Sequence, residues 1–180
     1  MRGHEIETKV DAHLTEEEFI LKLGGAVDVT HFYGDDYFFN HPSDVFMRTS
    51  FFRLRTDNHR AEFTSKMATS KNSIINRFEG NIKIDKNTSV EDIESLLKPV
   101  GYQFSYRLYK EGIVVFQNNL IYSYYVANDR PFIEVEVAES YSEDLETNLA
   151  KLAHGMAILG ITPNMQLTES LCTLCHPKRI

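Results

Sequence analysis

The 180-residue sequence contains no apolar run that approaches the ~20 residues needed for a membrane-spanning helix. Its opening residues, Met1 to Glu5, also lack the apolar segment of a secretory signal, so we expect a cytoplasmic protein. Basic residues are outnumbered, with 19 Lys and Arg against 26 Asp and Glu, and the net charge is −7. A broad nucleic-acid-binding surface is therefore disfavoured, although a local basic pocket is not.

Cysteine is scarce, and its two copies, Cys172 and Cys175, lie in the run Cys-Thr-Leu-Cys-His. This pattern matches c-type haem attachment and also a redox pair. Haem attachment of this type belongs to exported proteins, and half a zinc site would need a second ligand pair, which is not evident. We therefore interpret Cys172 as a small buried residue and Cys175 as a thiol in the tail.

Strand signals dominate the rest of the sequence, and its 42% hydrophobic content is enough for one domain over residues 1–180. Many sequential strands with few helices indicate an α+β protein with an antiparallel sheet or a closed barrel. The predicted strands are His4–Val10, Val27–Phe39, Phe51–Asp57, Arg60–Met67, Ser73–Ile84, Tyr102–Tyr109, Gly112–Gln117, Leu120–Ala127 and Phe132–Glu139. The predicted helices are Thr15–Leu23, Ser89–Lys98, Ser142–Leu159 and Asn164–Leu174.

The first predicted strand carries the most informative side chains. Glu5, Glu7 and Lys9 are spaced two residues apart, so all three share one face of the strand. Adjacent carboxylates on that face lie ~7 Å apart, which lets both reach one hard cation. Oxygen ligands beside a fixed ammonium group suit a metal-bound polyphosphate.

The same alternation of charged and apolar residues recurs in four later strands. Their charged or polar faces carry Arg53 and Arg55; Glu62, Thr64 and Lys66; Arg77, Glu79, Asn81 and Lys83; and Glu134 and Glu136. A solvent-facing side of an antiparallel sheet would explain any one of these strands. If the faces instead pointed into a closed barrel, the charges would be costly to bury unless a ligand or metal completed them. The pattern alone leaves both orientations open.

In their order along the chain, these motifs resemble the CYTH, or triphosphate tunnel metalloenzyme, superfamily. The run from Glu5 to Lys9 is similar to its Glu-x-Glu-x-Lys signature. An Asp-x-Tyr-Phe segment of the family is matched by Asp35-Asp36-Tyr37-Phe38-Phe39-Asn40, and its Arg-x-Arg strand by Phe52-Arg-Leu-Arg55. A strand lysine of the family is matched by Lys66, and its Arg-x-Glu strand by Arg77-Phe-Glu79. A late Glu-x-Glu strand is matched by Phe132-Ile-Glu-Val-Glu136. The resemblance spans Glu5 to Glu139 and leans toward the branch of class IV adenylyl cyclases and thiamine triphosphatases.

The resemblance implies an eight-stranded antiparallel β-barrel that forms a tunnel, with helices packed outside and the charged faces inward. It implies that one or two Mg²⁺ or Mn²⁺ ions are held by Glu5, Glu7, Glu134 and Glu136. It implies that the triphosphate is bound by Lys9, Arg53, Arg55, Lys66, Arg77 and Arg107. Either Glu79 or Glu136 is expected to position the attacking water. Guanidinium groups suit this task because they bind phosphate oxygens in bidentate fashion.

Three positions depart from the family pattern. The family has a lysine two residues before Arg107, where this chain has Ser105. It has an aspartate ten residues before Glu134, where counting back gives Tyr124. Asn81 stands where a glutamate is expected. Because tyrosine is a poor ligand for a hard cation, these departures motivate an altered or inactive metal site.

Three functions follow as hypotheses. The first is metal-dependent hydrolysis of a nucleoside, thiamine or inorganic triphosphate. The second is an adenylyl cyclase, which needs a base pocket that the aromatic residues could supply by stacking, namely Tyr33, Tyr37, Phe38, Tyr106 and Tyr109. The third is a binding protein that sequesters a polyphosphorylated ligand without turnover. The expected partner is a small-molecule triphosphate. Nucleic acid is not expected apart from a 5′-triphosphate RNA end, nor is a membrane partner, and homodimer formation is left open.

Overall fold

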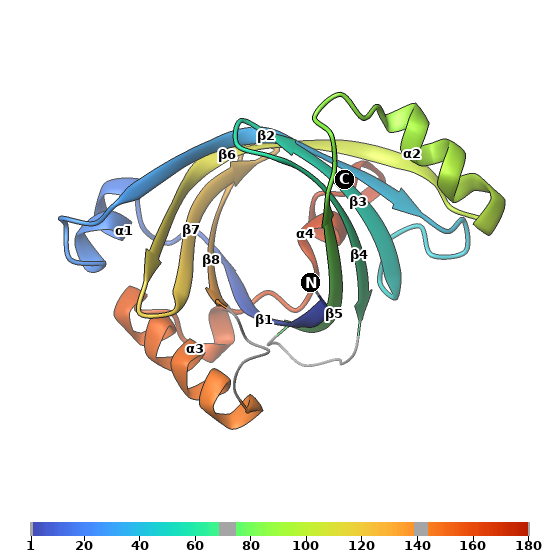
Figure 1. The fold of residues 1–180 in the computed structure, drawn as a ribbon. Coiled ribbons are helices and arrows are strands. Elements are labelled where there is room, and N and C mark those ends of the chain that lie inside the picture. Colours follow the sequence, from blue (N-terminus) through green and yellow to red (C-terminus); the bar gives the residue numbers. More distant parts are fainter. Residues whose placement is uncertain (1, 69–74, 139–143, 180) are drawn as a thin grey trace.

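The computed structural model describes residues 2–68, 75–138 and 144–179, with the backbone alone at residues 2–5, 68, 75–78 and 179. Within these residues, eight antiparallel strands close into a barrel with the order β1-β5-β4-β3-β2-β6-β7-β8 (Figure 1). The strands are β1 (Arg2–Asp11), β2 (Val29–Asn40), β3 (Ser50–Asp57), β4 (Ala61–Ala68), β5 (Ile75–Lys83), β6 (Gln103–Gln117), β7 (Leu120–Ala127) and β8 (Arg130–Val137). The predicted α+β barrel is confirmed.

Strand β1 closes the barrel because it pairs with β5 along its first half and with β8 along its second. The change of partner falls at Glu7, which lies opposite both Ile75 and Glu136. Tight hairpins join β6, β7 and β8, with positive φ angles at Asn118 and Asn119 in the first of them. Asparagine tolerates this backbone conformation, which two-residue hairpin turns require.

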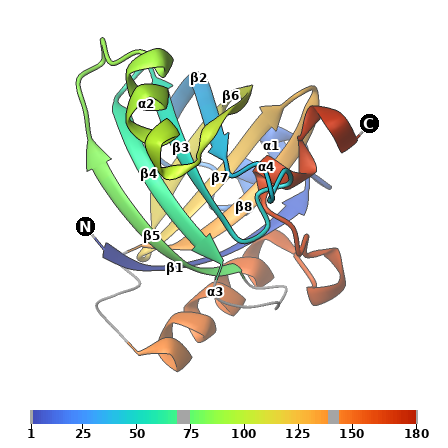
Figure 2. The same ribbon diagram turned by 90° about the vertical axis from the view of Figure 1, so that its right-hand side faces the viewer.

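The helices cover the outside and one end of the barrel (Figures 1 and 2). They are α1 (Glu16–Lys22), α2 (Val90–Leu97), α3 (Leu145–Leu159) and α4 (Leu171–Leu174). Helix α3 packs on the outer wall of β1, β7 and β8, where a Cβ at Gly155 would come within 2.8 Å of Leu120 Cδ1. Apolar residues of the outer wall, such as Val135, are therefore buried, and the inner wall is left to other side chains.

Two elements differ from the sequence prediction. The predicted strands Tyr102–Tyr109 and Gly112–Gln117 form one long strand, β6, which passes through Gly112 without a turn. A Cβ there would approach Tyr124 O to 2.1 Å, so the glycine permits a close strand crossing. The predicted terminal helix is a 3₁₀ turn at Pro163–Met165 followed by the short α4.

Three predicted boundaries, at Ser73, Glu139 and Ser142, lie outside the described residues. None of the helices in the described part of the chain has the length and apolar character of a membrane span.

Candidate functional site

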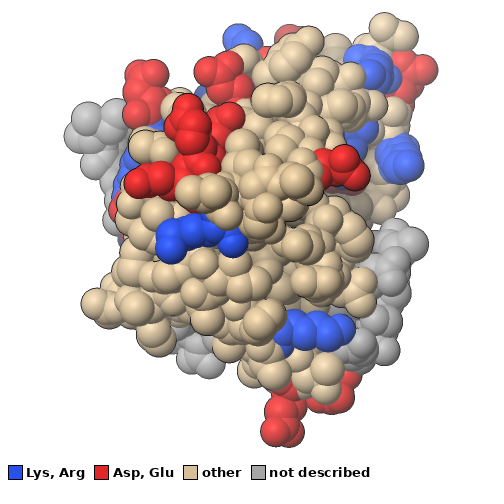
Figure 3. Space-filling view, turned by 90° about the vertical axis from the view of Figure 1, so that its left-hand side faces the viewer, with Lys and Arg blue, Asp and Glu red and all other residues tan. Residues whose placement is uncertain are grey.

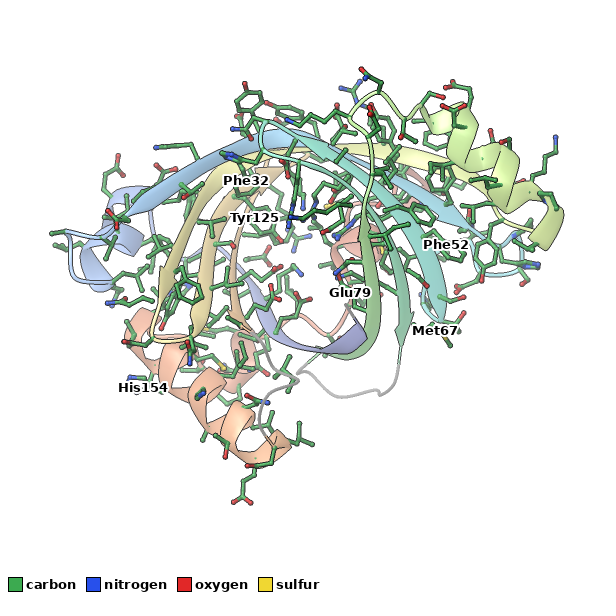
Figure 4. All side chains as sticks on the ribbon, viewed as in Figure 1. Phe32, Phe52, Met67, Glu79, Tyr125 and His154 are labelled. Carbon is green, nitrogen blue, oxygen red and sulfur yellow. The ribbon has the colours of Figure 1, made fainter. Side chains whose placement is uncertain are left out.

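The interior of the barrel holds two connected cavities. We call the first, of about 230 Å³, the inner chamber; its charged lining is Glu7, Lys9, Asp36, Arg53, Arg55, Arg60, Glu62, Lys66, Glu79, Lys110, Glu134 and Glu136. The second, of about 420 Å³, is the outer chamber, whose own lining is Thr30, Phe32, Gly34, Asp57, His59, Val114 and Ser123. Several residues line both chambers, including Tyr125, Glu134 and Glu136. Figure 4 shows Tyr125 and Glu79 reaching into the barrel from opposite walls, while His154 lies on the outside.

Three carboxylates converge on one side of the inner chamber. Glu7 of β1 and Glu134 and Glu136 of β8 each place an oxygen within 4.8 Å of the others. Burial and the charges of Glu7 and Glu134 raise the pKa of Glu136 to about 8. The cluster therefore has more negative charge than its protein neighbours compensate, and its all-oxygen donor set fits a hard divalent cation such as Mg²⁺ or Mn²⁺.

Lys9 holds one member of this cluster in place. Its ammonium group lies 2.7 Å from Glu134 Oε2 and 3.4 Å from Glu7 Oε1. Burial alone would lower the pKa of Lys9, but the two carboxylates outweigh it and raise the pKa well above its ordinary value. Burial would likewise raise the pKa of Glu134, yet Lys9 lowers it to about 2. The pair thus stays ionised at neutral pH.

A second charged cluster centres on Asp36 of β2. Its carboxylate accepts two hydrogen bonds from Arg55, at 2.7 and 3.0 Å, and lies 2.9 Å from the ammonium group of Lys110. These cations hold the pKa of Asp36 well below its ordinary value although burial opposes them. Burial and the nearby Arg55 lower the pKa of Lys110 to about 8, against the opposing effect of Asp36.

Arg53 differs from Lys9, Arg55, Lys66 and Lys110 because its charge is only loosely matched, and it is more buried than Arg60, whose ion pairs are 3.6 and 3.7 Å long. The guanidinium nitrogens of Arg53 lie 3.8 to 3.9 Å from carboxylate oxygens of Asp36, Glu62 and Glu79. Its closest hydrogen bond is to the hydroxyl of Thr64, at 3.2 Å, and its Nε has no hydrogen-bond partner among the described residues. The residue is 8% exposed. A buried guanidinium with an unused donor is suited to an incoming anion.

Lys66 and Glu79 face each other across β4 and β5. Their charged atoms lie 2.7 Å apart, and the other oxygen of Glu79 accepts a 2.7 Å hydrogen bond from Asn81. Both oxygens of Glu79 are thus engaged, and the carboxylate fixes the position of the lysine. This geometry makes Glu79 a positioning residue for Lys66.

Acidic and basic side chains line the inner chamber in equal number. Its six acids, Glu7, Asp36, Glu62, Glu79, Glu134 and Glu136, face six bases, Lys9, Arg53, Arg55, Arg60, Lys66 and Lys110, among the described residues. Because the pKa of Glu136 is raised to about 8, this acid is largely protonated at neutral pH until a cation binds. A triphosphate carries about four negative charges at neutral pH, which divalent cations offset. A metal–triphosphate complex would therefore bring less negative charge into the chamber than the bare anion.

Most of the predicted site residues meet in the inner chamber. These are Glu7, Lys9, Arg53, Arg55, Lys66, Glu79, Glu134 and Glu136. The side chains of Glu5 and Arg77 lie outside the described part of the structure. Their backbones place the two residues opposite each other in the β1–β5 pair.

The prediction that Arg107 lines the tunnel is wrong. The side chain of Arg107 is 58% exposed and forms two hydrogen bonds with Asp35, at 2.6 and 2.8 Å. Alternation along β6 places the buried Tyr106 and Lys110 on the other face of the strand. Ser105 and Arg107 therefore lie on the outward face of β6, and the inward cation of this strand is Lys110, three residues after Arg107.

A similar displacement, of one residue, affects β7. Tyr124, compared above with a family aspartate, packs outside the barrel against Phe19, with ring centres 5.8 Å apart. The inward residue is Tyr125, whose hydroxyl donates a 3.1 Å hydrogen bond to Glu134 Oε2. Tyr125 therefore supports a member of the carboxylate cluster without replacing one.

Sequence reasoning missed Lys110 and the central position of Asp36. Lys110 gave no signal because β6 was split into two strands, which hid its place in the alternation. Asp36 was noted only as part of a motif. Its place on the same face of the sheet as Arg55 becomes clear only from the β2–β3 register, in which the two residues are opposite each other.

The aromatic residues proposed as a base pocket do not gather in one place. Tyr33 and Tyr109 are 58% and 45% exposed, and Tyr37 packs toward Phe104. Phe38 and Tyr106 stack with ring centres 5.0 Å apart in an apolar cluster, and Phe38 also lines the inner chamber. The five residues therefore do not form one stacking pocket.

The Cys-Thr-Leu-Cys-His segment helps to close the same end of the barrel. Ser170, Leu171 and Cys172 line the inner chamber, and the Cys172 carbonyl accepts a 2.5 Å hydrogen bond from Tyr106. Cys172 is buried as expected, and Cys175 is a free thiol in the tail that is buried as well. In the described residues, the group of acids, cysteines and histidines with metal-binding geometry is the glutamate cluster, which does not include these thiols.

The exterior shows no comparable concentration of basic charge on the face next to α1. Figure 3 shows that face as largely uncharged, with acidic side chains gathered in its upper part. An anion is therefore drawn to the interior of the barrel more than to this surface.

Comparison with solved structures identifies the same fold in three informative proteins. A Pyrococcus horikoshii OT3 protein matches with a TM-score of 0.75 and 19% identity, over 97% of this chain and 99% of that one. A candidate adenylate cyclase from Vibrio parahaemolyticus matches with a TM-score of 0.68 and 15% identity, over 93% and 95%. A candidate adenylyl cyclase from Hippeastrum with a dominant triphosphatase activity matches with a TM-score of 0.61 and 16% identity, over 87% and 88%.

The chain has the same fold as these three proteins. The resemblance inferred from the ordered motifs is thus confirmed at the level of the fold. No family model and no curated protein matches the sequence itself. The shared architecture combined with identities below 20% explains why the motifs could be recognised while their register slipped at β6 and β7.

Proposed function

We propose that the protein hydrolyses a triphosphate inside the barrel with the help of a divalent metal ion. The observation that carries the proposal is the pairing of two features in one cavity. One is the convergent cluster of Glu7, Glu134 and Glu136, and the other is the buried guanidinium of Arg53 with its unused Nε donor. The first suits a hard cation and the second suits a phosphate oxygen.

The carboxylate cluster would hold Mg²⁺ or Mn²⁺, which when bound supplies charge stabilisation to the phosphoryl oxygens. On the opposite side, Arg53, Lys66 and Lys110 would contact the phosphate chain and stabilise negative charge on the leaving group. Glu79 holds Lys66 for this task. Positioning and electrostatics supply most of the rate in phosphoryl transfer, so this division of labour is sufficient.

Of the two carboxylates expected to position water, Glu136 is the better placed. Both oxygens of Glu79 are engaged, by Lys66 and Asn81, whereas Glu136 faces both chambers. We therefore assign Glu136 to orienting the water for in-line attack on the terminal phosphorus, and Glu79 to positioning Lys66.

A direct assay tests the proposal. The purified protein is incubated with Mg²⁺ or Mn²⁺ and with ATP, thiamine triphosphate, tripolyphosphate or a 5′-triphosphate RNA. We expect metal-dependent release of orthophosphate from at least one of these compounds. Release of pyrophosphate together with a cyclic nucleotide would show that the protein is a cyclase and not a hydrolase. Tight binding of a triphosphate without either product would show that the protein sequesters its ligand.

Glu7→Gln is the variant that tests the metal cluster in this assay, because it removes one charge from the cluster while keeping the shape of the side chain. We expect it to abolish metal-dependent turnover and to leave the circular dichroism spectrum unchanged. Unchanged turnover would exclude the cluster from the reaction.

A further inference from the structure

A separate cavity lies outside the tunnel, on the outer wall of the barrel beside α1 (Figure 1). It has a volume of about 410 Å³, and we call it the side groove. Outward-facing side chains of β2, β6 and β7 form its floor, and the first turn of α1 contributes to its border. Its lining includes Glu16, Tyr33, Tyr109, Glu111, Ile113, Tyr124 and Val126.

The pairing of the strands places a carboxylate in the middle of this floor. Glu111 of β6 lies opposite Tyr33 of β2 on one side and opposite Val126 of β7 on the other. Two residues further along β6, Ile113 lies opposite Tyr124. Directly opposite side chains on one face of a sheet have Cβ atoms ~5 Å apart, and diagonal neighbours remain within reach of aromatic rings. The Glu111 carboxylate is thus surrounded by rings and aliphatic side chains.

Two tyrosines present their rings to this groove without being packed into the protein. Tyr33 and Tyr109 are large and exposed, and neither belongs to an apolar cluster of the described residues. The hydroxyl of Tyr109 donates a 3.0 Å hydrogen bond to Glu111 Oε2, which fixes the ring beside the carboxylate. The faces of phenol rings attract cations. The groove therefore offers a carboxylate and aromatic faces to one positively charged group.

The negative charge of the side groove is unmatched by the protein. Glu16 and Glu111 line it, but none of its described lining residues is a lysine or an arginine. On the same outer wall, by contrast, Asp35 has a 2.6 Å ion pair with Arg107. Burial, and after it the carboxylates in the first turn of α1, raise the pKa of Tyr124 on the floor of the groove. The field of these acids thus reaches into the cavity, where it favours a cation.

A hard metal ion does not fit this arrangement. In the described residues, the group of acids, cysteines and histidines with metal-binding geometry is the glutamate cluster of the tunnel, so Glu16 and Glu111 have no third ligand of this kind. The two carboxylates come from different elements, α1 and β6, and Ile113 and Val126 add apolar surface. An organic cation with more than one charge and an apolar frame matches these features.

We propose that the side groove binds an aliphatic polyamine, with ammonium groups at Glu16 and Glu111 and the carbon chain over Ile113 and Val126. The rings of Tyr33 and Tyr109 stabilise the ammonium group nearest Glu111. A cavity of about 410 Å³ has the size of a small-molecule site. The inference goes beyond the proposed function and does not depend on it, because the groove lies on the outside of the barrel wall.

Calorimetric titration of the purified protein with spermidine and putrescine tests this site. Mg²⁺ is kept at saturating concentration, so that the acids of the tunnel do not compete for the amines. We expect spermidine to bind with one molecule per chain and more tightly than putrescine, because it carries more charge. Butanediol, the uncharged counterpart of putrescine, should show no binding, and added salt should weaken the binding of both amines.

Two variants of the groove locate the site. Glu111→Gln removes the central charge while keeping the shape of the side chain, and should weaken spermidine binding by about fivefold to tenfold. Tyr33→Ala removes an exposed ring and should weaken it by about twofold to fivefold. The matched control is Glu91→Gln, which removes an exposed carboxylate from the first turn of α2 and should leave the affinity unchanged. Thermal unfolding checks the fold of each variant.

Glu7→Gln is the control for binding inside the tunnel, and it should also leave the affinity for spermidine unchanged. Four results would overturn the proposal. They are the absence of spermidine binding, equal losses of affinity in Glu111→Gln and Glu91→Gln, loss of binding in Glu7→Gln, and binding of a lysine-rich peptide without binding of spermidine. The last result would assign the groove to a protein partner. Failure of the triphosphate assay would leave the polyamine site unaffected, since the titration contains no triphosphate.

Discussion

The tunnel has two kinds of wall, which differ in the charge of their side chains. Strands β1, β2, β3, β4, β5 and β8 and the first half of β6 present acids and bases to the inner chamber, while β7 and the second half of β6 present Val114, Ile121 and Ser123 to the outer chamber. Most charges at the first wall lie in ion pairs, but Glu7, Glu134 and Glu136 form a cluster of like charge. The second wall contributes uncharged side chains, and the charged residues that also line the outer chamber come from the first wall and the β3–β4 turn.

The comparison also separates the cations from one another. Arg55 and Lys110 are engaged by Asp36 at distances of 3.0 Å or less, and Lys9 by Glu134 at 2.7 Å. Arg53 has no ion pair shorter than 3.8 Å among the described residues. The closely paired cations stabilise the barrel, whereas Arg53 keeps a buried Nε donor without a partner among the described residues.

The largest effect is expected at the carboxylate cluster. Glu136→Gln removes the charge that Glu7 and Glu134 oppose, and should lower kcat by about a hundredfold or more because a metal and water position is lost. The free energy of unfolding should stay equal or rise, since a like-charge repulsion disappears. Steady-state kinetics and urea denaturation measure the two quantities. If Glu136→Gln loses both activity and stability, the carboxylate of Glu136 has a structural role and the predicted role in the reaction is not supported.

The next effect contrasts two neighbouring arginines. Arg53→Ala should raise KM for the triphosphate by about tenfold to a hundredfold with little change in stability, because it removes a charged hydrogen bond to the ligand. Arg55→Ala should lower the free energy of unfolding by roughly 3 kcal/mol, because it leaves Asp36 buried without its closest partner. Equal stability losses in the two variants would contradict the distinction drawn between free and engaged cations.

The sequence predicted the charged wall far better than the uncharged wall, and the reason is physical. Charged residues at alternate positions, such as Arg53 and Arg55, indicate a strand and at the same time show which residues share one face of it. The family resemblance then supplied the inward orientation. Apolar residues on both faces, as around Val114, look like an ordinary buried strand, so the outer chamber left no distinct signal.

The positions that could not be predicted depend on long-range register. A two-residue alternation reverses its faces when the comparison slips by an odd number of residues, which exchanges Tyr124 for Tyr125 after one residue and Arg107 for Lys110 after three. The irregularity between Phe38 and Phe39 in the β2–β6 pair adds a shift that local patterns do not show. Which of these residues face the tunnel is therefore decided by how the strands pair, and the composition of each strand does not reveal it.

A pH effect is expected at the boundary of the two walls. The pKa of Lys110 is lowered to about 8 by burial and by Arg55, so this lysine loses its charge as the pH rises through that value. The pKa of Asp36 is far lower and that of Tyr125 is raised, so neither changes charge there. The pKa of Glu136 is also about 8 in the metal-free protein, but a bound Mg²⁺ ion would keep this carboxylate ionised. At saturating Mg²⁺, kcat/KM for the anionic substrate should therefore fall above about pH 8.

Lys110→Arg is the variant that assigns this alkaline limb. Arginine keeps its charge throughout the accessible range, so the fall in kcat/KM should move to higher pH. A limb that stays in place in Lys110→Arg would assign it to another group.

The smallest effect is expected outside the barrel, at Arg107. Its ion pair with Asp35 lies on the surface, with 58% of the arginine side chain exposed, so Arg107→Ala should change KM by less than about twofold. Lys110→Ala, on the opposite face of the same strand, should raise KM because it removes a cation from the tunnel. Measured side by side, the two variants test the strand register itself. A large KM effect at Arg107 and a small one at Lys110 would restore the register first read from the sequence and turn β6 inside out.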